Sequence, residues 1–131
     1  MKNFWFTMLL SGLLFGTPLA GVSAATNTVT SALKVELQSA LLTFLEQGGD
    51  ADGTFRILDR KTGEMTQTHI GALHPKVIRV GPDFVLCIEM FDNLGQRHEA
   101  DFVMRQGTAG WLVTDVLFDQ QDLLKKARQQ N

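Results

Sequence analysis

Four carboxylates and a thiol lie close together in the second half of this 131-residue chain: Cys87, Glu89, Glu99, Asp101 and Asp115. A spacing of two residues, as from Cys87 to Glu89, puts side chains on the same face of a β-strand. On neighbouring strands such carboxylates could bind a cationic partner or ligand, hold a divalent cation, or share a proton for acid–base chemistry. Alternatively, they form an ordinary solvated face on which water screens the charges.

The register between the strands decides which of these side chains meet. We expect residues 93–95 to form a three-residue loop with a left-handed glycine. This register pairs Met90 with His98 and Leu86 with Phe102, so that one face of both strands is almost wholly apolar. A slip of one residue would mix the two faces, which disfavours it.

The opposite face of the same strands then carries the acidic residues. Cys87 faces Asp101, and Glu89 faces Glu99 one step along. Directly opposed like charges destabilise a sheet by about 0.2–1 kcal/mol. This cost can be accepted for a bound cation, for a basic partner, or because water screens the charges.

The last turn extends this face to a third strand. We expect Arg105 to pair with Trp111, which would place Asp115 beside Asp101. The same register would form an apolar patch at the other end of this face, from Val85, Val103, Trp111 and Val113. Exposed apolar patches often mark interfaces. A homodimer packed sheet to sheet is one expectation, and coverage by the C-terminal helix or the first hairpin is the other.

Other reactive residue types match no complete motif. Cys87 is the only cysteine, so no internal disulfide can form, and the register separates it from His98; we interpret it as a small structural residue. The three histidines match no compact zinc spacing, and residues 50–53 begin like a calcium loop but lack its later ligands. No metal or other cofactor is expected.

The elements that would position these residues are a long helix, an antiparallel meander and a short helix. The apolar stripe predicts a helix over 30–47, with Thr28 or Thr30 as cap and Gly48-Gly49 as a left-handed stop. Strands are expected at 54–59, 64–70, 77–91 with an interruption at 81–83, 98–105 and 111–118, with a loop at His74-Pro75 and a helix over 120–130. The fold class is α+β: one long N-terminal helix packed on a curved antiparallel sheet of four to five strands in meander order, with a short C-terminal helix.

This order of elements resembles the cystatin-like and NTF2-like α+β rolls. The inhibitory cystatins carry a Gln-x-Val-x-Gly loop that enters protease clefts. The nearest segment here runs from Gln67 to Gly71 and has His69 in place of the valine, inside an expected strand. Protease inhibition is therefore not expected from this resemblance.

The first 24 residues have the pattern of a cleavable signal peptide. Lys2 precedes an apolar run of about 13 residues, which is shorter than the roughly 20 needed to span a bilayer. Pro18 follows the run, and Val22-Ser23-Ala24 fits a cleavage site. We expect a single soluble α+β domain over residues 25–131, periplasmic or secreted and free of the membrane after cleavage; a retained N-terminal anchor is the alternative.

The charge balance and the missing motifs limit the function. Beyond Lys2 the chain has eleven basic and fourteen acidic residues, which disfavours nucleic acid and anionic membranes as partners. The leading hypothesis is an exported binding or interaction module that takes a protein partner or small ligand through the sheet face or the roll cavity. Its candidate residues are Glu89, Glu99, Asp101, Asp115, Trp111 and His98. The alternative is a small NTF2-like isomerase or hydrolase that uses a carboxylate or histidine in the cavity, where His98 and Thr114 would point, joined by His69 if its strand faces inward.

Overall fold

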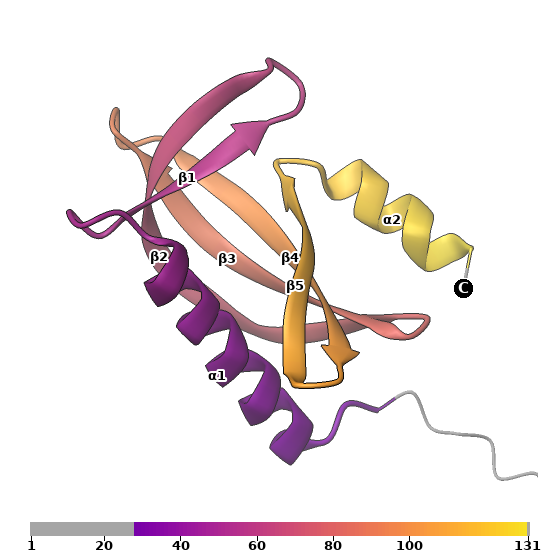
Figure 1. Cartoon of the computed structure of the whole chain (residues 1–131). Helices are drawn as coiled ribbons and strands as arrows, with labels where there is room; N and C mark the ends of the chain where they lie inside the picture. The colour runs from indigo at the N-terminus through magenta and orange to yellow at the C-terminus, as the bar shows by residue number, and fades with distance from the viewer. Residues whose placement is uncertain (1–27, 131) are drawn as a thin grey trace, which may run out of the picture.

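The computed structural model describes residues 28–130, and it confirms the α+β architecture (Figure 1). The five strands form one antiparallel sheet in the order β1-β2-β3-β4-β5, which curves nearly into a barrel with α1 packed against it. The expected signal peptide, residues 1–24, lies outside the described residues. The elements are α1 (Ser31–Gly48), β1 (Thr54–Asp59), β2 (Glu64–Val80), β3 (Asp83–Asp92), β4 (Arg97–Gly107), β5 (Gly110–Phe118) and α2 (Gln121–Gln129).

Helix α1 supplies one side of the hydrophobic core. Thr30 caps its start by accepting a hydrogen bond from the backbone N–H of Leu33 at 3.2 Å. Three leucines at a spacing of four lie on one face of the helix and are buried: Leu37, Leu41 and Leu45. They pack against inward-facing residues of the strands, chiefly Phe55, Ile57, Leu86, Ile88, Met90, Phe102, Met104 and Phe118, and Leu73 and Val77 of β2 pack at the margin of this core.

The end of α1 differs from the expected left-handed stop. Gly49 has φ −76° and ψ 154°, an extended conformation, and Gly48 still belongs to the helix. A Cβ atom on Gly48 would lie 2.9 Å from Cε2 of Phe55. The absence of a side chain at Gly48 thus lets the helix end approach the first core residue of β1.

Strand β2 is longer than expected, with 17 residues. His74-Pro75, predicted to be a loop, lies within this strand, at a point where the register to β3 shifts twice between Ile70 and Val77. Proline is tolerated there because a bulge removes the need for its missing backbone donor. These irregularities bend β2. The interruption predicted at residues 81–83 is the break between β2 and β3, with Gly81 at φ 58°.

The register between β3 and β4 is the predicted one. Met90 pairs with His98 and Leu86 with Phe102, and Gly95 is left-handed with φ 76°. The inward-facing residues of both strands are buried in the core. The outer face of these two strands therefore carries the acidic residues as expected.

The register between β4 and β5 was predicted wrongly. Arg105 pairs with Leu112, not with Trp111, because Gly107 and Gly110 pair directly at the end of the hairpin. A bulge beside Val103 then leaves Thr114 as the extra residue of β5. The pairing at the turn shifts the alternation of β5 by one residue, and the bulge shifts it by one residue again. Side chains between the turn and the bulge therefore face the side of the sheet opposite to the one expected.

The C-terminal helix α2 lies beside β5, outside the sheet (Figure 1). Leu124 is the buried residue of this helix, whereas its neighbour Leu123 is about half exposed. Within residues 28–130, no helix has the length and apolarity to cross a membrane.

Candidate functional site

The opposed pair Glu89 and Glu99 forms as predicted, and Arg97 of the same chain partly neutralises it. A terminal nitrogen of Arg97 lies 2.7 Å from Oε1 of Glu89 and 3.2 Å from Oε1 of Glu99. On its other side, Glu89 lies 3.3 Å from Nε2 of His74. The place of a cationic partner between these two carboxylates is therefore taken by Arg97.

Asp101 and Cys87 also pair as predicted, and both side chains are at least partly buried. Asp101 is only 1 % exposed, and its Oδ2 accepts a hydrogen bond of 2.7 Å from Nε2 of Gln121, at the start of α2. Burial raises the pKa of Asp101. Burial and the nearby carboxylates, first Asp101, raise the pKa of Cys87 to about 12. The thiol therefore stays protonated near neutral pH and is not an activated nucleophile.

The apolar patch expected around Trp111 does not form on the outer face. Because of the β4–β5 register, Trp111 and Val113 pack against the core, on the helix side of the sheet. The indole of Trp111 stands edge-on to Phe84, with ring centroids 5.5 Å apart. Val85 remains on the outer face but is 2 % exposed. The hydrogen bond from Gln121 to Asp101 brings the start of α2 onto the acidic part of this face, and the apolar patch that the C-terminal helix was expected to cover is not present there.

His98 points inward as predicted, but both of its ring nitrogens are engaged. Nδ1 lies 2.7 Å from Oδ2 of Asp119, and Nε2 lies 3.2 Å from Oδ2 of Asp92, while the ring stacks on Phe118. Burial lowers the pKa of His98, but the hydrogen bonds and negative charges of Asp119 and Asp92 outweigh burial and raise it overall. His98 therefore clamps the β3–β4 turn to the β5–α2 junction.

The other polar residues considered for a catalytic cavity do not join His98. Thr114 is exposed at the bulge, and its hydroxyl donates to the carbonyl of Val103 at 3.2 Å. His69 is also exposed. In the part of the chain that the structure describes, no group of three or more His, Cys, Asp or Glu residues is arranged to hold a metal ion.

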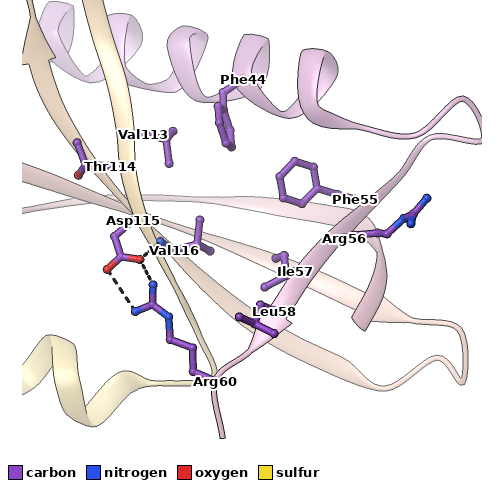
Figure 2. A pocket seen from close by; sticks show the side chains of 10 residues that line it. All are labelled: Phe44, Phe55, Arg56, Ile57, Leu58, Arg60, Val113, Thr114, Asp115 and Val116. Carbon is purple, nitrogen blue, oxygen red and sulfur yellow. Dashed lines mark hydrogen bonds and ion pairs between the residues drawn. The ribbon is translucent and has the colours of Figure 1, made fainter. Parts of the chain in front are cut away.

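A cleft between the two edge strands, β1 and β5, is the feature that the sequence did not predict (Figure 2). It has a volume of about 350 Å³. Phe44 of α1, Phe55 and Ile57 of β1, and Val113 and Val116 of β5 form its apolar lining. Figure 2 shows β1 and β5 separating from the Arg60 end toward α1, with Phe44 pointing into the space between them.

A single ion pair bridges the narrow end of this cleft. Arg60, in the turn after β1, contacts Asp115 of β5 with both terminal nitrogens, at 2.6 and 3.3 Å. Asp115 faces Val103 on β4, so it does not lie beside Asp101 as predicted. Arg56 also borders the cleft, but its guanidinium points away from it and binds Asp50 at 2.8 Å.

The cleft and its ion pair depend on how far the sheet curves. The order of strands marks β1 and β5 as the edges, and this signal was present in the predicted meander. The distance between the edges, however, follows from the bent β2 and the bulge at Thr114. Comparisons with protein-family models, curated proteins and solved structures give no match.

Proposed function

We propose that this chain is a non-enzymatic binding module, exported to the periplasm or the extracellular space, and that the cleft between β1 and β5 is its ligand site. The leader pattern of residues 1–24 supports the location. The order of elements, which resembles the cystatin-like and NTF2-like rolls, supports a ligand site where the curved sheet and the helix meet.

The observation that carries this proposal is the composition of the cleft. Its volume of about 350 Å³ falls within the range of small-ligand pockets, about 300–1,000 Å³. Three elements supply its apolar walls, and the Arg60–Asp115 pair supplies polar groups at one end. An apolar pocket with a few convergent polar groups is the usual form of a binding site.

The state of the polar candidates favours binding over catalysis. Carboxylates occupy both nitrogens of His98, and the thiol of Cys87 has a pKa of about 12. The carboxylates Glu89 and Glu99 share Arg97. Each of these groups is thus either paired within the fold or held in its protonated form.

Binding of the neutral apolar dye Nile red tests the proposal. In the purified protein, we expect dye fluorescence to rise and saturate. Val113→Phe fills the cleft and should weaken dye binding about tenfold or more. Leu112→Phe is the matched control, because this neighbouring side chain is exposed and does not line the cleft, and it should leave binding unchanged.

Thermal melts of both variants would show that they are folded. Absence of saturable dye binding to the unmodified protein, or equal loss of binding in the two variants, would contradict the proposed site.

A further inference from the structure

The free edge of β5 has a backbone donor that points into the cleft. Val116 pairs with Phe102 of β4, yet its N–H donates to Oδ1 of its own neighbour, Asp115, at 2.8 Å. This N–H therefore points away from β4, toward β1. In a β-strand the carbonyl of a residue points to the same side as its N–H, so both backbone groups of Val116 face the cleft.

The carboxylate of Asp115 accepts the hydrogen bond that the N–H of Val116 would otherwise donate to a neighbouring strand. It accepts from Val116 and is held by Arg60, which comes from the far wall of the cleft. The Arg60 and Asp115 side chains are 51 % and 40 % exposed, and ion pairs this exposed contribute little to stability. The edge of β5 is thus capped by a contact that a competing backbone can displace.

We infer that the ligand of the cleft is an extended peptide segment, which adds as a strand to the free edge of β5, pairs with the backbone of Val116 and places an apolar side chain among Phe44, Phe55 and Val113. This inference rests on the proposed binding function and names the class of ligand. Addition of a strand to an open edge is a common mode of peptide recognition, in which backbone bonds give affinity and pockets for alternate side chains give specificity.

The direction of the strands fits this ligand. In an antiparallel meander β1 and β5 run the same way, so one peptide lies antiparallel to both edges.

The charge at the cleft also favours a peptide. Arg60 and Asp115 neutralise each other. The pair therefore leaves no net charge that would select a charged head group over the neutral amides of a peptide.

Single N-methylation of a short peptide tests the inference. The probe is a blocked pentapeptide of alternating threonine and valine, bound to the ¹⁵N-labelled protein and followed by NMR. We expect the Val116 amide resonance to shift on titration. N-methylation at alternate positions should abolish binding, because it removes the N–H groups that face β5, while the positions between should tolerate it.

Uniform tolerance of N-methylation along the peptide, or shifts confined to the outer face of the sheet, would overturn the inference. Saturable Nile red binding without peptide binding would overturn the peptide alone and leave the proposed cleft intact. Failure of both probes would remove the binding site itself.

A protein variant gives an independent test. Asp115→Ala removes the side chain that caps Val116 and should strengthen peptide binding roughly tenfold, since the peptide no longer displaces a hydrogen bond. Asp122→Ala, an exposed carboxylate on α2, is the matched control and should leave affinity unchanged. Thermal melts would show that both variants fold, and weaker peptide binding to folded Asp115→Ala would contradict the proposed pairing.

Discussion

At the scale of single residues, burial changes what ordinary side chains can do. Asp101 and Cys87 lie on the outer face of the sheet, yet Asp101 is almost fully buried and the thiol is partly buried. Both pKa values rise, because each group would carry a negative charge in surroundings that solvate it poorly. For His98, two carboxylates raise the pKa by more than burial lowers it.

Alkylation of Cys87 should be slow and strongly pH-dependent. Because the pKa of the thiol is about 12, its rate with iodoacetamide should still rise between pH 8 and 10, where an ordinary thiol, with a pKa near 8.5, levels off. Asp101→Asn removes the nearest negative charge, should lower the pKa of Cys87 and should increase the rate at pH 8. Mass spectrometry gives both rates, and a plateau below pH 9 in the unmodified protein would contradict this prediction.

His98 should stabilise the protein most below neutral pH. Its pKa is raised in the folded state, so its contribution is fully present below the unfolded pKa of about 6.5 and is lost as the pH rises through the folded pKa. In urea unfolding, His98→Gln should therefore lose more stability relative to the unmodified protein at pH 5 than at pH 9. A larger loss of stability at pH 9 than at pH 5 would show that the contacts of His98 with Asp92 and Asp119 do not depend on the protonated imidazole.

At the scale of elements, the faces of α1 and β3 follow their sequence patterns closely. The leucines of α1 are buried where the stripe predicts, and the register of β3 with β4 follows from alternation and the turn at Gly95. In both elements a local period of 3.6 or 2 residues coincides with the burial that the core requires. These parts of the fold could be predicted without the rest of the molecule.

Two neighbouring leucines of α1 test whether the apolar stripe marks the buried face of the helix. Leu41→Ala should lower the free energy of unfolding by about 2–5 kcal/mol, because Leu41 is fully buried in the core. Leu42→Ala should change it by less than about 0.5 kcal/mol, because that side chain is 44 % exposed. Urea unfolding of both variants measures the difference, and similar losses would mean that α1 packs by another face.

At the scale of the whole molecule, the pairing of β5 with β4 decides which face of the sheet carries Trp111. Its indole packs on Phe84, and its Nε1 lies 3.5 Å from Oε2 of Glu36 on α1. The outer patch that suggested a homodimer loses this residue. A dimer through the remaining outer face stays a prediction, and it no longer depends on Trp111.

Replacing Trp111 should affect stability rather than association. Trp111→Ala should destabilise the protein by about 1–3 kcal/mol, below the value for a fully buried aromatic residue, because the indole is only partly buried. Leu112→Ala, its exposed neighbour, should have little effect. Sedimentation velocity should give the same profile for both variants and the unmodified protein, and dissociation of an oligomer by Trp111→Ala alone would contradict this assignment.

The candidate site was predictable only in part. Glu89, Glu99, Asp101 and Cys87 meet as expected, since they lie on β3 and β4, whose register follows from the apolar pattern. Asp115 lies two residues along β4 from its predicted partner: the direct pairing of Gly107 with Gly110 accounts for one residue, and the bulge at Thr114, which no proline or glycine marks, accounts for the other. The pairing of Asp115 with Arg60 joins residues 55 positions apart, and no local pattern contains it.

The sequence by itself therefore determined the class of the fold, the order of its elements, the inward faces of α1, β3 and β4, and the pairing of acidic residues on the outer face. These features follow from short periods of apolar residues and from the turns between them. Only the tertiary structure decided the bends in β2, the face of Trp111 and the cleft between β1 and β5. The approach of two edge strands depends on the summed twist and bulges of the whole sheet, a quantity that no single segment encodes.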